Sequence, residues 1–383
     1  MKLKESLLPS ELPEELPAWF SGTGPEADLV ISTRIRLARN LANHRFTYHA
    51  GQPERKEIFG EVAAILARQR EFKAYSLINC SDITQLEREL LLEERLVSPD
   101  LLGVEGDRGV AIEKNRRTSI MINEEDHLRL HAIESGFQAE TVWERLTRLD
   151  DLLGHYLPFA YEARRGFLTS CPTNSGTGLR VSFLLHLPGL VLTKTIDPVL
   201  LGASQMGIST RGFFGEHSEV VGNLFQLSNQ ATLGAREEEF LQHTRTIIAE
   251  VITHERKARE TLLTEAKAEL SDKIHRSWGI LQHAQLLTVM EFLNLSSALR
   301  FGLDCGVFSG LTPERLNQLT LMVMPAHLQR HLGKTFTEEK LQAVRADFVR
   351  NFLAHPPEQP KRTRTRRTPS PGKNNGKRGD TTI

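Results

Sequence analysis

The chain has 383 residues, enough for two domains with a sizeable core, and its 39% hydrophobic and 25% charged content is ordinary for a soluble globular protein. Lys and Arg number 48 and so do Asp and Glu, so the overall charge indicates no particular partner. The cysteines Cys80, Cys171 and Cys305 are too few and too scattered for a disulfide framework or a CxxC metal site, which favours a reducing cytoplasm. No stretch of about 18 apolar residues is present and the first residues lack an unbroken apolar segment, so we expect neither a membrane span nor a signal peptide.

The first two thirds of the chain combine short strands with helices. Residues 1–28 are rich in Pro, Glu and Gly and are expected to form an extension with one short helix. In the first strand Arg34 and Arg36 are two residues apart, so they share one face while Ile35 and Leu37 share the other. The predicted strands cover residues 29–36, 109–112, 118–123, 166–169, 190–193, 205–210 and 223–228. The predicted helices cover residues 54–72, 84–96, 137–154 and 179–187.

From about residue 235 the pattern is helical, with little strand signal. Helices are predicted over residues 235–279, 281–301, 312–324 and 337–354. After Pro356 the sequence is basic and almost free of apolar residues, so residues 356–383 are expected to be a disordered tail.

Two carboxylates far apart in the sequence are candidates for acid–base chemistry on a guanidine. A guanidinium has a pKa above about 12, so it must lose a proton as it attacks a phosphate. One carboxylate can hold two guanidinium nitrogens in a fork while another takes the proton. We predict that Glu125 and Glu216 fill these roles, with Glu125 as the base.

Arginines on the predicted strands and short loops are candidates for binding a triphosphate together with Mg²⁺. The residues that fit are Arg34, Arg36, Arg129, Arg180 and Arg211. Cys171 begins the loop Cys171-Pro-Thr-Asn-Ser-Gly-Thr-Gly178, just before a predicted helix and among these arginines. The start of a helix and the nearby arginines would both favour the thiolate form of Cys171, which could then touch the substrate guanidinium.

Each feature alone also has an ordinary interpretation. A run of acids is usually solvated surface, and a lone cysteine is usually a small buried hydrophobe. Ser175-Gly-Thr-Gly-Leu-Arg180 matches neither the Walker A nor the Rossmann pattern. His127 and His131 are four residues apart, but a zinc site needs a third ligand, so no metal ligands are predicted. The functional interpretation rests on finding all these features in one chain.

Four stretches make the chain resemble the phosphagen (ATP:guanido) kinase family and, within it, the bacterial protein-arginine kinases. They are Ser32-Thr-Arg-Ile-Arg-Leu-Ala-Arg39, Asn123-Glu-Glu-Asp-His-Leu-Arg129, Cys171-Pro-Thr-Asn-Ser-Gly-Thr-Gly-Leu-Arg180 and Arg211-Gly-Phe-Phe-Gly-Glu-His-Ser-Glu219. Small-molecule phosphagen kinases resemble one another in an N-terminal helical domain of about a hundred residues, a common small-domain size. Here only about 28 residues precede the first strand and the helical region is C-terminal, which favours the protein-arginine kinases.

The resemblance implies an α+β fold, an antiparallel sheet flanked by helices followed by a C-terminal helical domain. The expected division is an extension over 1–28, a catalytic domain over 29–258, a helical regulatory or dimerisation domain over 259–355 and a basic tail over 356–383. The implied activity is ATP- and Mg²⁺-dependent phosphorylation of arginine side chains in proteins. In the family this is often a degradation mark read by a Clp-type unfoldase, in stress response and protein quality control. A zinc-binding activator protein and a homodimer are implied as well.

The resemblance also implies roles for individual residues. Glu125 matches the carboxylate that deprotonates the guanidine, Glu216 the second substrate clamp and Cys171 the substrate-loop cysteine. The five arginines named above match phosphate-binding positions. Nucleotide contacts, in part through backbone groups, are implied for Ser32, Thr33, Arg34, Ile35, Arg36, Arg180, Val181, Ser182, Phe183, Leu184, Arg211, Gly212, Phe213, Phe214 and Gly215.

The sequence departs from the family pattern at two places. Arg95 stands where the family commonly has a nucleotide-contacting histidine, and we expect nucleotide binding to be retained because arginine can stack on adenine or meet phosphate. In the helical region Leu341 and Gln342 replace the Arg and Asp of an Arg-Asp-x-x-Arg-Ala motif that binds phosphoarginine, while Arg345 and Ala346 match. The loss of those charges argues against activation by phosphoarginine.

Three alternatives stay open. The chain could phosphorylate a free guanidino metabolite, or it could be a catalytically weak adaptor that binds phosphoarginine. The basic tail, Lys361 to Arg378, is either a solubilising or self-phosphorylated segment or a docking element for nucleic acid or an acidic partner. Nucleic-acid binding is disfavoured among these.

Overall fold

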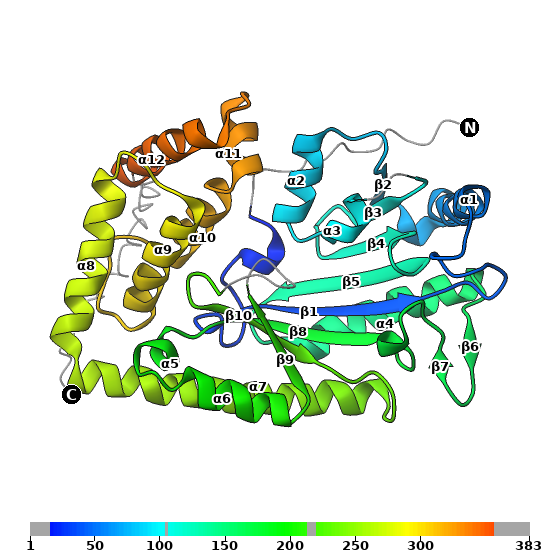
Figure 1. The fold of residues 1–383 in the computed structure, drawn as a ribbon, viewed down its shortest axis with the longest axis horizontal. Helices are drawn as coiled ribbons and strands as arrows, with labels where there is room; N and C mark the ends of the chain where they lie inside the picture. The colour runs from blue at the N-terminus through cyan, green and yellow to red at the C-terminus, as the bar shows by residue number, and fades with distance from the viewer. Residues whose placement is uncertain (1–15, 104–105, 213–219, 356–383) are drawn as a thin grey trace, which may run out of the picture.

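The computed structural model describes residues 16–103, 106–212 and 220–355. Its centre is one eight-stranded sheet in the order β2-β3-β4-β5-β1-β8-β10-β9, in which every neighbouring pair is antiparallel (Figure 1). The strands are β1 Val30–Arg39, β2 Tyr75–Asn79, β3 Gly109–Glu113, β4 Thr118–Ile122, β5 Leu128–Ser135, β8 Leu179–His186, β9 Ile208–Gly212 and β10 Leu224–Asn229. A separate hairpin is made by β6 Tyr161–Glu162 and β7 Gly166–Phe167.

One face of the sheet is apolar because alternate residues of each strand point to opposite sides. Ile35 and Leu37 of β1 and Val181 and Phe183 of β8 are fully buried in one cluster with the apolar residues of α4 and α7. Burial of each such side chain stabilises the fold by about 1.5–3 kcal/mol. The helices of this half are α1 Gln52–Arg68, α2 Gln85–Glu93, α3 Pro99–Leu102, α4 Ala139–Tyr156, α5 Pro188–Leu192, α6 Ile196–Gln205 and α7 Glu237–Glu265.

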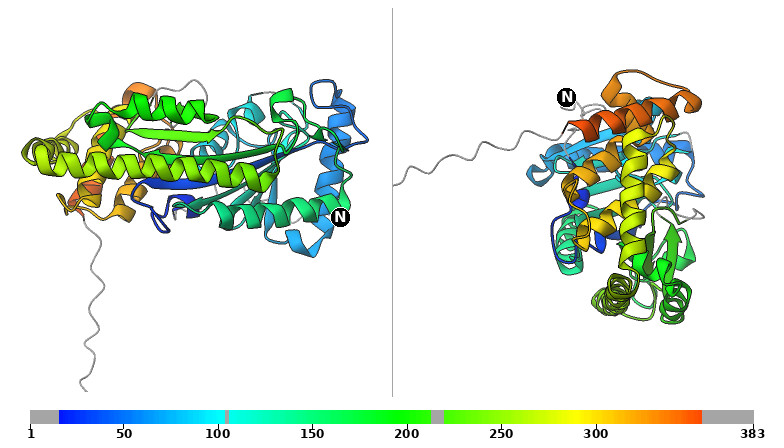
Figure 2. Two further views of the ribbon diagram at one scale, coloured as in Figure 1. Left: turned by 90° about the horizontal axis from the view of Figure 1, so that it is seen from below. Right: turned by 90° about the vertical axis from the view of Figure 1, so that its left-hand side faces the viewer.

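A second group of helices lies at one end of the sheet. Figures 1 and 2 show α7 running from the sheet to this group, whose members are α8 Lys267–His283, α9 Val289–Asp304, α10 Pro313–Met322, α11 Pro325–Leu332 and α12 Glu338–Ala354. Their core also contains Trp19 and Phe20 of the short helix η2 (Ala18–Phe20), together with Ile31 and Ile133 of the sheet. The helical group therefore shares one continuous apolar core with this end of the sheet.

The predicted fold class is confirmed: an antiparallel sheet flanked by helices with a C-terminal helical region. The predicted hairpin over 109–123 and the first three predicted helices are confirmed, with ends that differ by a few residues. The helical pattern predicted over 235–279 corresponds to two helices, which are separated at Ala266. Helix α11 was not predicted. Residues 1–15 and the tail 356–383 lie outside the described residues, and the predicted domain boundaries stay a prediction.

Two predicted elements are wrong. Residues 179–187 were predicted as a helix but form strand β8, because Leu179, Val181 and Phe183 alternate with the polar Arg180 and Ser182. Residues 190–193 were predicted as a strand but lie mostly in helix α5. Pro188 opens that helix, and proline at the first helical position leaves no hydrogen bond unmade.

A buried ion-pair network joins α7 to α5 and α9. The Glu255 carboxylate accepts hydrogen bonds from the backbone N–H groups of Gly189 and Leu190, at 2.8 and 2.9 Å, and from Arg259 Nε at 2.8 Å. Arg259 Nη1 lies 3.4 Å from the Asp304 carboxylate at the end of α9. Burial raises the pKa of Asp304 to about 6 in spite of this arginine.

Replacement of Asp304 by Asn is expected to change how stability depends on pH. Because the folded pKa is raised, the protonated carboxyl contributes stability that is present below pH 4 and is lost as the pH rises through 6. The free energy of unfolding of Asp304→Asn, minus that of the wild type, should therefore increase by about 2–3 kcal/mol between pH 4 and pH 7. Urea unfolding at both pH values measures this difference, and a difference that does not change with pH would contradict the expectation.

Candidate active site

The polar face of the sheet carries arginines on three adjacent strands. Arg36 of β1 lies directly opposite His131 of β5 and Arg180 of β8, and Arg34 lies opposite Ser182 of β8. Neighbouring strands are about 5 Å apart, so these side chains form one compact group. Arg129 of β5 lies opposite Ala38 on the same face. We call Arg34, Arg36, Arg129 and Arg180 the cation face.

The cation face concentrates positive charge on a partly buried surface. Burial, followed by Arg95 and Arg129, lowers the pKa of Arg34 to about 9. Burial, followed by Arg34 and Arg129, also lowers the pKa of Arg36 well below its usual range. Burial, followed by Arg34, Arg36 and Arg95, lowers the pKa of His131 well below its usual value, so this histidine is neutral at pH 7. A polyanion on this face would relieve the repulsion, and the strands hold the arginines in place before it binds.

Arg180 is held by hydroxyl groups of the neighbouring strands. Its Nη2 donates to Ser228 Oγ on β10 at 2.8 Å and to Ser209 Oγ on β9 at 3.0 Å. Arg211 follows on β9, opposite Gln226 of β10, so it lies on the same sheet near the edge strand. Gly212 ends that strand, while Phe213, Phe214, Gly215 and Glu216 lie outside the described residues. The structure therefore places four of the five predicted arginines together and the fifth two strands beyond Arg180.

The predicted nucleotide segments 32–36 and 180–184 lie within strands β1 and β8. Their backbone groups pair with each other and with β5 or β10 in the sheet. Arg34 and Arg36 reach the cation face, whereas Ile35, Val181 and Phe183 point into the apolar cluster. Thr33 is also buried and donates from Oγ1 to the Gly136 carbonyl at 2.6 Å. Nucleotide contacts by the remaining predicted residues of these segments stay a prediction.

Beside the cation face lies an acidic turn, residues 123–127, between β4 and β5. Arg129 Nη1 donates to Glu124 Oε1 at 2.6 Å and its Nη2 donates to Glu125 Oε2 at 2.5 Å. Glu124 is fully buried and also accepts from Ser98 Oγ at 2.5 Å and from the Glu125 N–H at 2.9 Å. Glu125 is more accessible, since its side chain is 24% exposed. Of the two, Glu125 is the carboxylate that a substrate can reach.

The other polar residues of the acidic turn hold it in place. Asp126 Oδ1 accepts from Asn40 Nδ2 at 2.6 Å and from the Ser170 N–H at 2.7 Å. The ring nitrogens of His127 bond to the Leu41 N–H and the Arg45 carbonyl, at 3.0 and 2.9 Å. The Nδ1 of His131 lies 3.2 Å from Ser119 Oγ. Within the described ranges no group of three or more His, Cys, Asp or Glu could hold a metal ion.

The Cys171 loop packs against the acidic turn. Asn174 Nδ2 donates to Glu125 Oε2 at 3.3 Å, which places the loop beside the candidate base. Gly176 has a φ of 107°, and a Cβ there would lie 2.4 Å from the Thr232 carbonyl, so the loop requires glycine. Cys171 is half-buried and its Sγ lies 3.0 Å from Thr173 Oγ1. The structure therefore brings Cys171 and Glu125 into one region.

One part of the argument for a Cys171 thiolate is wrong. The turn after Cys171 is a three-residue 3₁₀ helix, Pro172–Asn174, and not the start of a longer helix. Such a short turn has almost no dipole to stabilise an anion. The thiolate stays a prediction that rests on the substrate guanidinium and the nearby arginines.

Sequence reasoning missed three residues that contact the candidate base or its neighbour: Glu124, Asn174 and Ser98. Glu124 and Asn174 lie inside the motifs that contain Glu125 and Cys171, so their place in the sequence could have indicated that they belong to the site. Ser98 gave a weaker one, as the residue before Pro99 at the start of a helix. Only the folded chain shows that its hydroxyl meets Glu124.

Arg345 of the C-terminal motif is a structural residue here. It is fully buried, its Nε donates to the Val323 carbonyl at 2.8 Å and its Nη1 donates to the Leu287 carbonyl at 2.9 Å. Leu341 and Ala346 are buried as well. This guanidinium contributes to the packing of α12. The effect of Leu341 and Gln342 on activation by phosphoarginine stays a prediction.

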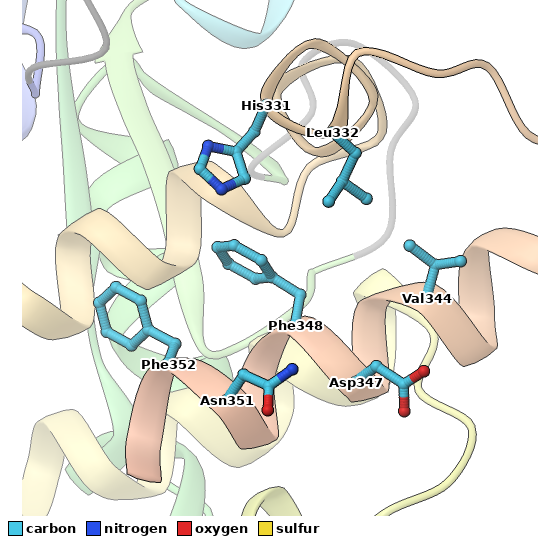
Figure 3. A pocket seen from close by; sticks show the side chains of 7 residues that line it. All are labelled: His331, Leu332, Val344, Asp347, Phe348, Asn351 and Phe352. Atoms are coloured by element: carbon cyan, nitrogen blue, oxygen red, sulfur yellow. The ribbon is translucent and has the colours of Figure 1, made fainter. Parts of the chain in front are cut away.

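A cavity of about 460 Å³ lies between α11 and α12 in the helical group. Figure 3 shows its lining from α11 and α12: His331, Leu332, Val344, Asp347, Phe348, Asn351 and Phe352. The rings of His331 and Phe348 meet edge to face, with centroids 5.4 Å apart. The lining is mainly apolar and holds no arginine, so it does not form part of the site described above.

Comparison with known proteins agrees with this geometry. Residues 56–258 match the family described as ATP:guanido phosphotransferase, C-terminal catalytic domain, and residues 267–364 match the Protein-arginine kinase McsB C-terminal domain. The chain is 40% identical over 340 residues to the protein-arginine kinase of Halothermothrix orenii, covering 89% of this chain and 97% of that protein. It is 39% identical to the protein-arginine kinase of Moorella thermoacetica, covering 88% and 97%.

Among solved structures, a crystal structure of lombricine kinase has a similar fold. The TM-score is 0.53 at 25% sequence identity, covering 64% of this chain and 70% of that chain. With the sequence matches, this similarity makes the protein an enzyme, a phosphotransferase that uses ATP and acts on a guanidino group. The chain belongs to the protein-arginine kinases of the ATP:guanido phosphotransferase family. None of the helices in the described ranges has the length and apolar character needed to cross a bilayer.

Proposed function

We propose that this enzyme transfers the γ-phosphoryl group of ATP to arginine side chains of proteins, at the border between the cation face and the acidic turn. The observation that carries the proposal is Arg129, whose guanidinium bonds Glu124 at 2.6 Å and Glu125 at 2.5 Å while it lies among the other arginines. The proposed phosphate-binding group, Arg129, and the proposed base, Glu125, are thus immediate neighbours. That is the arrangement an in-line transfer to a guanidine requires.

On the donor side, Arg34, Arg36, Arg129 and Arg180 neutralise the phosphates, and Arg211 contributes from β9. Burial, followed by the neighbouring arginines, lowers the pKa values of Arg34 and Arg36, and this supports the role because a triphosphate offsets the repulsion between the arginines. Mg²⁺ fits the site as a companion of ATP, since it is usually bound by phosphate oxygens and only one or two carboxylates. When bound, it would neutralise charge that develops on the transferred group.

On the acceptor side, Glu125 takes the proton that the guanidinium loses. Its neighbour Glu124 is poorly suited because its oxygens already accept from Arg129, Ser98 and the Glu125 N–H. Glu216 is proposed as the second clamp on the guanidine and Cys171 as a further contact to it. These two roles derive from the family motifs, and Cys171 is supported by the packing of its loop against Glu125.

Several finer functions stay proposals that rest on the family. They are marking of proteins for a Clp-type protease in stress response, regulation by a zinc-binding activator protein, a homodimer and a cytoplasmic location. Protein substrates are supported by the similarity of the whole described chain to protein-arginine kinases, and in particular by the matching C-terminal region.

An assay with two acceptors tests the proposed function. The enzyme is incubated with ATP and Mg²⁺ and with either an unfolded protein or free arginine, and phosphoarginine is measured by mass spectrometry under conditions that keep the acid-labile bond. We expect phosphoarginine on the protein and little on the free amino acid. Transfer to free arginine alone would show that the protein is a metabolite kinase. If it transfers no phosphate but still binds phosphoarginine, it is an adaptor.

A further inference from the structure

The C-terminal turn of α2 places Arg95 in an unusual backbone conformation. The Arg95 N–H donates to the Leu92 carbonyl at 2.9 Å and the Leu96 N–H donates to the Leu91 carbonyl at 3.0 Å, the pattern of a Schellman turn. Arg95 has a φ of 59°, a left-handed value that this turn normally assigns to glycine. The left-handed conformation of Arg95 must therefore be stabilised by contacts of its side chain or of the surrounding residues, because the backbone of arginine does not favour it.

The residue two positions earlier joins α2 to α11 of the helical group. Glu93 Oε1 accepts from the Ala326 N–H at 2.8 Å, and its Oε2 accepts from the His327 N–H at 3.0 Å and lies 2.6 Å from His327 Nδ1. Helix α11 has Met324 at its N-cap, so it has no side-chain cap of its own. A carboxylate from another element therefore caps this helix and bonds its first histidine.

Glu94 reaches the same histidine from the other side. Its Oε1 lies 3.4 Å from His327 Nε2 and accepts from Arg116 Nη1 at 2.7 Å, and its backbone carbonyl accepts from Trp19 Nε1 at 3.1 Å. His327 is fully buried, and although burial lowers its pKa, the hydrogen bonds that its ring donates to the carboxylates of Glu93 and Glu94 raise it overall. Glu93, the last residue of α2, and Glu94, its C-cap, thus hold one buried side chain of α11 from both sides. Figure 1 shows α2 and α11 as neighbours at the edge of the helical group.

The next residue, Arg95, belongs to the electrostatics of the cation face. Its guanidinium lies 5.3 Å from the ring centroid of Trp19, the residue that bonds Glu94. Among charged groups, Arg95 has the largest effect on the pKa of Arg34, and it acts on His131 as well. Three consecutive residues therefore connect α11, through Glu93 and Glu94, to the arginine beside Arg34.

We propose that Glu93 and His327 are positioning residues for the nucleotide: their bond between α2 and α11 sets Arg95 beside Arg34, so that the affinity for ATP depends on the docking of α11. This inference rests on the proposed function, because it takes the anion on the cation face to be ATP. The groups that perform the transfer, Glu125 and Arg129, lie outside the linkage. Its disruption should therefore raise the KM for ATP and leave kcat nearly unchanged.

The experiment compares variants of His327 in the full chain. ATP binding is measured by calorimetry without an acceptor, kcat and KM are measured with an unfolded protein, and thermal unfolding verifies that each variant is folded. We expect His327→Ala to raise the Kd and KM for ATP about 10-fold and to change kcat less than 2-fold. His327→Asn, whose amide can replace Nδ1 and keep the bond to Glu93, should stay within 2-fold of the wild type. His331→Ala on the same helix is the matched control, and its Kd and KM for ATP should also stay within 2-fold of the wild-type values.

A double substitution shows whether His327 acts through Arg95. If it does, Arg95→Ala and Arg95→Ala/His327→Ala should weaken ATP binding equally, because the second change removes nothing further. Should His327→Ala fail to fold, Glu93→Gln gives the same test, since one amide oxygen still caps α11 while the ion pair is lost.

Two outcomes would overturn the inference. A folded His327→Ala that binds ATP like the wild type, or a loss in kcat at unchanged KM, would show that the linkage does not position the nucleotide. Additive effects in the double variant would show that His327 does not act through Arg95. A wild type that binds no ATP would overturn the proposed function as well, so the two failures can be told apart.

Discussion

Replacement of Glu125 by Gln is expected to lower kcat for arginine phosphorylation by about 10²- to 10⁴-fold, the usual contribution of a general base. The amide keeps the size of the side chain and can still accept from Arg129 and Asn174, which bond the carboxylate at 2.5 and 3.3 Å. It cannot take a proton from the guanidinium. Single-turnover measurement of phosphoarginine on an unfolded protein gives the rate of the chemical step, and calorimetry shows whether ATP still binds.

The control for Glu125→Gln is Glu144→Gln on α4, where the side chain is 68% exposed. This variant should be as active as the wild type. If Glu125→Gln keeps more than about a tenth of wild-type kcat, another group accepts the proton and the assignment of the base is wrong. If Glu125→Gln binds ATP more weakly but has an unchanged single-turnover rate at saturating ATP, Glu125 contributes to ATP binding and not to proton transfer.

Replacement of Arg36 by Gln is expected to lower kcat/KM by about 10²- to 10³-fold, as for the loss of one preorganised charge from a transition-state site. The same change should raise the stability of the nucleotide-free protein by about 1 kcal/mol. Arg36 lies between His131 and Arg180 and is crowded by Arg34 and Arg129, so its removal relieves repulsion and the burial of a charge. Scanning calorimetry with and without ATP measures the stability, and initial rates with an unfolded protein as acceptor measure kcat/KM.

The comparison for Arg36→Gln is Arg148→Gln, whose side chain is 80% exposed on α4 and should change neither quantity. In the wild type, ATP should raise the unfolding temperature more than in Arg36→Gln, because binding energy adds to stability. A less stable Arg36→Gln that keeps its activity would contradict the role of the cation face. It would show that Arg36 serves the fold and not the phosphates.

Much of the donor side could be predicted from the sequence because a strand repeats every two residues. The alternation of Arg34 and Arg36 with Ile35 and Leu37 predicted one cationic and one apolar face, which the structure confirms. What could not be predicted was which strands lie beside β1. The pairing of Arg36 with both His131 and Arg180 depends on register over long sequence separations, and no local pattern sets it.

The sequence predicted which residues belong to the acceptor side but not how they are arranged in space. The sequence offers three adjacent acids, and only the bonds of Glu124 to Ser98 and Arg129 show that Glu125 is the accessible one. The error over residues 179–187 had a different cause. An apolar segment before a proline suits a helix end, and the strand period in it was overlooked because Leu184, Leu185 and Leu187 interrupt the polar alternation.

The two halves of the site differ in how they are built. The cations lie on central strands, bonded on both sides, whereas Glu125 and Cys171 lie in connections between strands. Connections accept insertions and substitutions that a central strand does not. An engineer who wished to retarget this enzyme to a different guanidine could therefore exchange the two connections and leave the ATP machinery intact.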